Sequence, residues 1–286
     1  MSATAPNPAE LYEQFYGPGI FQPLARLFLD FVGLRQGERV LDLACGTGIV
    51  ARRAAPLLGR SGRVVGVDVN PAMLAVARRL PVPGGAPIEW REGDAMELDL
   101  GDERFDVALC QQGLQFFPDP VPALRRVQAA LLPGGRFAVA AWQEIERQTF
   151  LARFAEVEAR YLEPLGVSYD DLVAPFTLGR PGRLQELLAG AGLAEVRVVP
   201  ASVRTRFPDP ESFVRKVERA YGAVVPAFVA DPAAFEAFVG VVERETSELV
   251  REHTVDGFVT FEMHTWLASA RATGGRPESI EVAVPA

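Results

Sequence analysis

The stretch Val40-Leu41-Asp42-Leu43-Ala44-Cys45-Gly46-Thr47-Gly48 decides the fold of this chain. Its first four residues form a mainly apolar run, typical of a strand that is buried on both faces in a parallel sheet. Two glycines follow, and residues 49–55 have helical spacing. Such a strand–turn–helix unit exposes backbone N–H groups and the helix dipole to an anionic ligand. Since ligands of open α/β sheets bind at the carboxyl ends of strands, we expect a nucleotide-type pocket beside Asp42.

Strand and helix patterns alternate five times between Arg39 and about Trp142. The later strand patterns are Val64–Asp68, Ile88–Ala95, Phe105–Gln112 and the segment that begins at Leu131–Phe137. The connections are too short for a second domain, so the alternation predicts a parallel sheet wound by right-handed crossovers.

The motif Asp42-x-Ala44-Cys45-Gly46-Thr47-Gly48 resembles motif I of the class I S-adenosylmethionine-dependent methyltransferases, and the four later stretches match the same family in order. The resemblance implies an α/β, Rossmann-like, seven-stranded, mostly parallel sheet. Its last strand runs antiparallel between the fifth and the sixth. The cofactor it implies is S-adenosyl-L-methionine. The antiparallel last strand and the element Gly93-Asp94-Ala95 both argue against a nicotinamide-dependent dehydrogenase. It is also disfavoured because Ala51 stands where the dinucleotide fingerprint has a third glycine.

Asp68 follows Gly48 by 20 residues, where a carboxylate at the end of the second strand accepts both ribose hydroxyls. The alternative for Asp68 is a surface acid that caps the next helix. By resemblance, Asp94 and Ala95 contact the adenine edge, and the carbonyl of Gln111 faces the methionine ammonium. The two methionines of the set either sandwich the adenine or pack in the core. The complete expected cofactor set is Tyr16, Asp42, Ala44, Gly46, Gly48, Asp68, Val69, Met73, Asp94, Ala95, Met96 and Gln111.

The chain outside the alternating region predicts a cover and a cap. Two helices, Pro8–Tyr16 and Ile20–Val32, are expected with a break at Gly17-Pro18-Gly19. Further helices are expected over 147–162, 181–189, 210–221 and 232–251, with strands over 196–199 and 257–267. The expected organisation is an N-terminal helical cover 1–37, a cofactor-binding core 38–142, cap helices 143–178, a core helix and sixth strand 179–207, cap helices 208–255, the last strand 256–272 and a tail 273–286.

Candidate substrate-lining residues are Phe15, Phe21, Gln112, Gln115, Tyr161 and Tyr221. The alternatives are that the aromatic residues pack in the core and that the glutamines only hold a turn together. Of the two histidines, His264 has the position of a packed strand residue. His253, between a helix and the last strand, is a weak candidate for a general base. No catalytic residue is assigned.

The composition of the chain argues against several classes of binding partner and site. The formal net charge of −8 argues against nucleic acid. The only cysteines, Cys45 and Cys110, predict no disulfide framework and a reducing cytoplasm, and no His or Cys cluster indicates a metal. No secretory signal is visible, and residues 224–242 carry too many charged and proline residues for a membrane span.

Two functions remain open. The leading one is methylation of a small, fairly apolar molecule at O, N or C, as in the quinone-biosynthesis C-methyltransferases and secondary-metabolite methyltransferases that the chain resembles. The alternative is a non-methylating user of the same fold, in which the cofactor is structural and the cap serves another reaction, such as a cyclisation.

Overall fold

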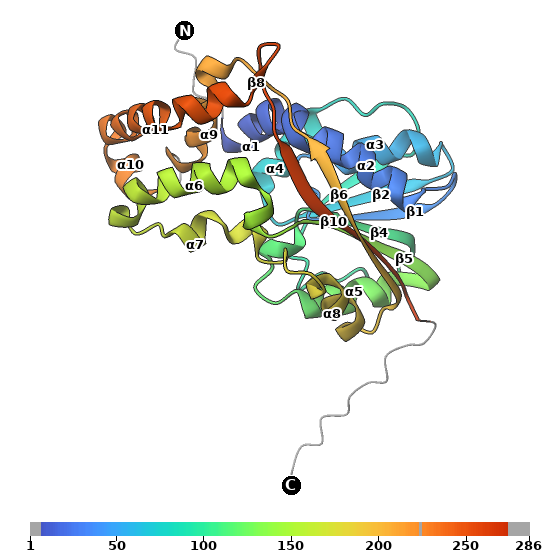
Figure 1. Ribbon diagram of the computed structural model, residues 1–286. Helices are drawn as coiled ribbons and strands as arrows, with labels where there is room; N and C mark the ends of the chain where they lie inside the picture. The colour runs from blue at the N-terminus through green and yellow to red at the C-terminus, as the bar shows by residue number, and fades with distance from the viewer. Residues whose placement is uncertain (1–6, 223–224, 274–286) are drawn as a thin grey trace.

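The computed structural model describes residues 7–222 and 225–273 and contains a seven-stranded sheet in the order β3-β2-β1-β4-β5-β10-β6 (Figure 1). Its strands are β1 (Arg39–Leu43), β2 (Arg63–Asp68), β3 (Ile88–Glu92), β4 (Phe105–Gln111), β5 (Leu131–Trp142), β6 (Ala194–Arg204) and β10 (Glu262–Arg271). Strand β10 lies antiparallel between β5 and β6, while β1 to β5 are parallel. The predicted fold class is therefore confirmed.

Helices cover both faces of the sheet. On one face, α2 (Gln22–Val32) and α3 (Ile49–Leu58) share a buried cluster with β1 and β4. On the other, α5 (Pro120–Ala130) and α8 (Arg183–Gly190) pack on β4, β5 and β10. Helix α4 (Pro71–Arg79) lies along β2 and β3. The central strands are therefore buried on both faces, as their apolar sequence requires.

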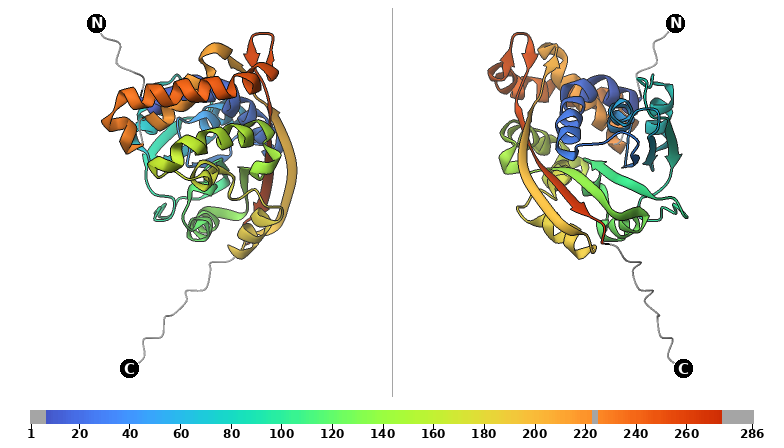
Figure 2. Two further views of the ribbon diagram at one scale, coloured as in Figure 1. Left: turned by 60° about the vertical axis from the view of Figure 1, so that its left-hand side comes forward. Right: turned by 90° about the vertical axis from the view of Figure 1, so that its right-hand side faces the viewer.

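A cap stands over the carboxyl-terminal edge of the parallel strands (Figures 1 and 2). It consists of α6 (Thr149–Leu162), α7 (Tyr169–Leu172), α9 (Pro210–Gly222), α10 (Pro226–Ala230), α11 (Pro232–Glu252) and a small sheet of β7 (Phe207–Pro208), β8 (Thr254–Val255) and β9 (Phe258–Val259). Its core is rich in aromatic rings. Phe150 stacks on Phe261 with centroids 4.2 Å apart, and Phe207 meets Phe213 edge-on at 5.3 Å. Such pairs add to the stabilisation that burial already provides.

The expected break at Gly17-Pro18-Gly19 is wrong. Helical winding continues from α1 (Pro8–Leu11) through a π-helix, η1 (Tyr12–Phe21), into α2. The N–H of Gln22 donates to the carbonyl of Gly17, five residues earlier. The wider winding accommodates Pro18, which lacks an N–H and does not fit a regular α-helix interior.

The last strand also differs from expectation. Residues 257–261 are not part of it: Phe258 and Val259 form β9, and β10 begins at Glu262. The N–H of Phe261 donates to Thr205 Oγ1 at 3.0 Å, and the N–H of Thr205 donates to the carbonyl of Phe261 at 2.9 Å. These two bonds hold the chain where it passes from the small sheet into the large one. Strand β6 is longer than the expected 196–199.

We expect Gly19→Ala to lower the free energy of unfolding by about 1–3 kcal/mol, the usual range for overpacking. A Cβ at Gly19 would lie 2.2 Å from the ring of Phe207. Gly17→Ala, in the same π-helix, is the matched control, because its Cβ would meet no atom closer than 3.6 Å. Urea denaturation measures both; equal losses would contradict the packing of Phe207 on Gly19.

Candidate cofactor and substrate site

The Gly-rich turn between β1 and α3 owes its path to residues with positive φ. Ala44, Gly46 and Gly48 have φ of +52°, +55° and +80°. A Cβ at Gly48 would also lie 2.2 Å from the indole of Trp90 on β3. Glycine is therefore needed at position 48 both for its backbone conformation and for the space that Trp90 occupies.

Asp68, at the end of β2, holds this turn in place. Its Oδ2 accepts the N–H of Gly46 at 2.6 Å, and its Oδ1 accepts the N–H of Asn70 at 2.8 Å. Hydrogen bonds to a carboxylate are stronger than those between neutral groups. One side chain thereby fixes the turn after β1 against the turn after β2.

Asp42 lies beneath the turn and is 1% exposed. Its Oδ2 accepts the N–H of Ala51 in the first turn of α3 at 3.0 Å. Burial raises the pKa of this carboxyl to about 7, and the hydrogen bond from Ala51 opposes the rise. Asp42 thus anchors α3 to the end of β1.

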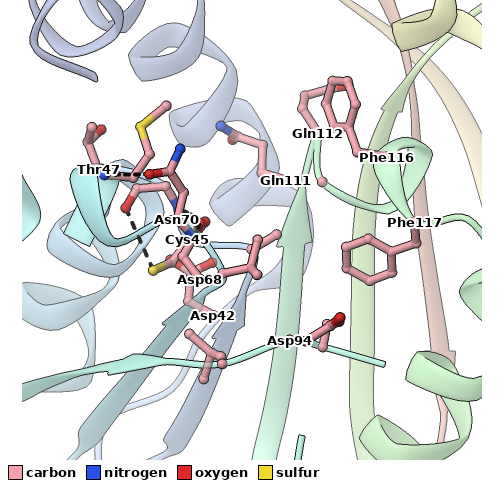
Figure 3. A pocket seen from close by; sticks show the side chains of 18 of the residues that line it. Asp42, Cys45, Thr47, Asp68, Asn70, Asp94, Gln111, Gln112, Phe116 and Phe117 are labelled. Atoms are coloured by element: carbon pink, nitrogen blue, oxygen red, sulfur yellow. Dashed lines mark hydrogen bonds between the residues drawn. The ribbon is translucent and has the colours of Figure 1, made fainter. Parts of the chain in front are cut away.

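A cavity of about 490 Å³ opens beside these residues (Figure 3). Ten of the twelve expected cofactor residues line it, namely Asp42, Ala44, Gly46, Asp68, Val69, Met73, Asp94, Ala95, Met96 and Gln111. Gly48 belongs to the same turn but does not line the cavity, and its Cα faces the indole of Trp90. Tyr16 faces a different cavity, and Tyr12, one turn earlier in the π-helix, lines this one instead.

A second cavity of about 320 Å³ lies between the first and the cap. The two share three lining residues, Tyr12, Gln112 and Phe116, and Figure 3 shows Gln112 and Phe116 at one side of the first cavity. The walls of the second are mostly apolar and aromatic, including Tyr16, Phe21, Trp142, Leu151, Phe154, Phe213 and Met263. This is the composition expected of a pocket for a small apolar ligand.

Gln112 stands where the two cavities meet, and both atoms of its amide group form hydrogen bonds within the protein. Its Oε1 accepts the N–H of Trp142 at 3.1 Å and Nε2 of Gln115 at 3.0 Å. Its Nε2 donates to Thr265 Oγ1 at 3.3 Å. Of the two roles left open for this glutamine, the hydrogen bonds favour holding the turn. Gln115 lines the second cavity, and its Oε1 is buried with no hydrogen-bond partner in the part of the chain that the structure describes.

Several expected substrate or catalytic residues lie away from both cavities. His253 ends α11, with its Nδ1 2.9 Å from the carbonyl of Leu249 and its ring 5.0 Å from that of Phe150. His264 lies in β10. Tyr161 is directed outward, and its hydroxyl contacts Glu245. Phe15 is buried against Phe207 in the cap core.

Helix capping takes up the side chain of His253, the contact with Glu245 that of Tyr161, and aromatic packing that of Phe15, so the structure does not bring these residues to either cavity. Phe21 and Gln115, two of the candidate substrate residues, line the second cavity. The side chain of Tyr221 lies outside the described residues. Both cysteines are free and buried, and burial raises the pKa of the Cys110 thiol to about 12.

Sequence reasoning missed two kinds of site residue. Thr47 and Asn70 sit inside recognised motifs but carried no separate signal, although both line the first cavity. Glu158 lines the second cavity from α6, where it follows Phe154 by one helical turn. The sequence did contain a signal for Glu158, because it occupies a position on the buried face of a helix where an apolar residue is normally found.

A strand–turn–helix unit, an acid at the end of β2 and a cavity at the carboxyl edge of a parallel sheet define an α/β protein that binds a nucleotide cofactor. A family model described as "Methyltransferase domain" matches residues 40–135. The 2-phytyl-1,4-naphtoquinone methyltransferase of Thermosynechococcus vestitus is 32% identical over 190 residues, which cover 64% of this chain and 84% of that protein. The nocamycin O-methyltransferase of Saccharothrix syringae is 31% identical, with 69% and 74% covered. The chain belongs to the S-adenosylmethionine-dependent methyltransferases.

Other matches cover less or show the fold alone. The corresponding Synechococcus elongatus enzyme is 37% identical over 123 residues, and the chain spans about half of that relative, 53% of its length. The YcgJ protein from Bacillus subtilis has a TM-score of 0.56 at 18% identity, with 88% of this chain and 98% of that chain covered. It shares the Rossmann-like sheet.

The first cavity fits the family's cofactor, S-adenosylmethionine. Thr47 Oγ1 and Gln111 Oε1 belong to residues that line it, and both atoms are buried with no hydrogen-bond partner among the described residues. Buried polar atoms normally have partners, so a ligand with N–H donors, such as an ammonium group, would satisfy them. Asp68 and Asp94 add carboxylates on the same cavity.

Residues 7–222 and 225–273 contain no group of three or more His, Cys, Asp or Glu side chains placed to hold a metal ion. None of their helices has the length and apolar character needed to cross a membrane.

We expect the cofactor-free protein to lose unfolding free energy as pH rises from about 4 to 7. The carboxyl group of an aspartate in the unfolded chain has a pKa near 3.9. Each unit of difference between the folded and unfolded pKa corresponds to about 1.4 kcal/mol of stability. Folded Asp42, with its pKa raised to about 7, therefore binds more protons than the unfolded chain between these values.

Asp42→Asn should flatten this loss, because the amide oxygen still accepts from Ala51 but no longer titrates. Glu158 and Glu218 have raised pKa values too and remain in the variant, so the difference from the parent isolates Asp42. Urea denaturation at pH 5 and pH 8 measures it, with exposed Asp30→Asn as control. If the free energy of unfolding of Asp42→Asn changed with pH as much as that of the parent, the raised pKa of the buried Asp42 would be refuted as the cause.

Proposed function

We propose that this protein transfers the methyl group of S-adenosylmethionine to a small, fairly apolar molecule held in the second cavity. The observation that carries the proposal is the meeting of the two cavities at Tyr12, Gln112 and Phe116. One cavity has the motif residues of the family, and the other has mostly apolar walls. A ligand in each would meet at this shared wall.

The cofactor supplies an activated methyl group on a sulfonium, and its leaving group is neutral after transfer. The protein's task is to align the accepting atom with that methyl group, and orientation can contribute roughly 7–11 kcal/mol. In the proposed arrangement, Asp68 accepts the ribose hydroxyls, Asp94 and Ala95 contact the adenine, and Gln111 faces the ammonium. Met73 and Met96 lie on the same cavity and offer polarisable surface to the base.

The accepting atom is not assigned to O, N or C. Neither histidine lines the two cavities, so the proposal places the catalytic contribution in alignment and water exclusion. The relatives reported above include both a 2-phytyl-1,4-naphtoquinone methyltransferase and a nocamycin O-methyltransferase. What the two have in common is methyl transfer to a small molecule, and the proposal extends this to the present chain.

We expect Asp68→Ala to weaken binding of S-adenosylhomocysteine by about 1.5–3 kcal/mol, the range for hydrogen bonds to a charged group. Isothermal titration calorimetry measures the affinity, and circular dichroism checks that the fold is retained. Asp102→Ala, at an exposed position, is the control. Parental affinity in Asp68→Ala would remove the ribose role, and binding of NAD in place of S-adenosylhomocysteine would overturn the cofactor assignment.

We expect Ala155→Phe to abolish methyl transfer while affinity for S-adenosylhomocysteine stays within about tenfold, or roughly 1.4 kcal/mol. Ala155 is 6% exposed and lines only the second cavity, so a phenyl ring would occupy the space proposed for substrate. The assay follows labelled S-adenosylmethionine with a panel of phenols, quinones and amines.

Ala237→Phe adds the same volume at an exposed position of α11 and should keep parental activity. An Ala155→Phe variant that methylates as the parent does would place the substrate elsewhere. A parent that binds the cofactor and transfers no label to any compound of the panel would favour a non-methylating role.

A further inference from the structure

Two carboxyl groups are buried together in the cap. Glu158 on α6 is 4% exposed and Glu218 on α9 is fully buried. Among the described residues, no arginine or lysine forms an ion pair with either of them. Glu158 Oε1 and both carboxyl oxygens of Glu218 have no hydrogen-bond partner within the described part of the chain.

The pair adjoins the second cavity. Glu158 lines it, as do Val217, the neighbour of Glu218, and Tyr16. The Tyr16 hydroxyl donates to the carbonyl of Val217 at 3.4 Å. After burial, the charges of Glu218 and then Glu158 raise the pKa of this phenol. Tyr16 of η1, Glu158 of α6 and Val217 of α9 thus lie on one cavity whose wall is otherwise mostly apolar.

This arrangement costs stability in the absence of a ligand. Burial is the main reason that the pKa of Glu158 rises to about 7 and that of Glu218 rises well above its usual range. The charge of Glu158 adds to the rise in the pKa of Glu218. Apolar side chains of similar volume would avoid both penalties, so packing does not account for two glutamates here.

We propose that Glu158 and Glu218 bind the protonated amine of a substrate whose apolar body fills the second cavity. The inference rests on the proposed function and adds a substrate class to it. The unpartnered oxygens are acceptors, and a primary ammonium supplies three N–H donors together with the positive charge that stabilises a buried carboxylate. A neutral alcohol or quinone supplies fewer donors and no charge.

In this proposal the amine group anchors the substrate, and a different atom of the substrate accepts the methyl group. Neither glutamate lines the first cavity, and neither is among the three residues that the cavities share. The carboxyl pair is therefore a specificity-determining site, which holds one end of the substrate while another atom faces the methyl group.

Calorimetry with two probes of equal chain length, n-octylamine and 1-octanol, tests the proposal at pH 7.5 with the cofactor site saturated by S-adenosylhomocysteine. We expect the parent to bind the amine at least tenfold more tightly than the alcohol. Glu158→Gln and Glu218→Gln should each reduce this preference below threefold without weakening alcohol binding. Glu156→Gln, an exposed position on the same helix, should keep the parental preference.

Equal binding of the two probes to the parent, no detectable amine binding, or a preference that survives both glutamine variants would overturn the proposal. Each variant is first titrated with S-adenosylhomocysteine, so that a folding defect is separated from loss of the amine site. A parent that binds S-adenosylhomocysteine but shows no amine preference refutes only this inference. A parent that fails to bind S-adenosylhomocysteine refutes the proposed function itself.

Discussion

The carboxylate of Asp68 is the interaction on which the site depends. By accepting N–H groups from Gly46 and Asn70, it ties together the turns that follow β1 and β2. Trp90, on β3, packs against the same turn, because Gly48 and Gly66 leave room for its ring. Three neighbouring strands thus position one loop, and the cavity beside it has a fixed wall before any ligand binds. Preformed walls of this kind lower the ordering cost of binding.

The turn after β4 links this wall to the cap. Gln112 has φ of +54°, and a Cβ at Gly113 would lie 2.6 Å from that of Ala44, so the two turns are in close contact. The amide of Gln112 then bonds to β5 and, through Thr265, to β10. The sheet therefore supplies the cofactor cavity and the cap supplies most of the second one. In this arrangement, differences among caps would change the substrate while the sheet keeps the cofactor.

The sheet and its turns could be predicted from sequence because their signals are local: apolar runs, glycines and acids at fixed spacing. The π-helix could not, since Gly17-Pro18-Gly19 reads as a break and only tertiary packing shows that winding continues. For the same reason Tyr12, and not the expected Tyr16, lines the first cavity. The Glu158–Glu218 pair unites residues 60 positions apart, a juxtaposition that helical periodicity within either segment does not reveal.

The central claim is that the cofactor's reactive end faces the second cavity across the wall formed by Tyr12, Gln112 and Phe116. A crystal structure of the protein with S-adenosylhomocysteine tests it most directly. The account predicts the ribose hydroxyls on Asp68, and the sulfur directed past Gln112 and Phe116 toward the cap. A sulfur atom directed away from the second cavity, or a ligand bound outside the cavity beside the Gly-rich turn, would contradict it.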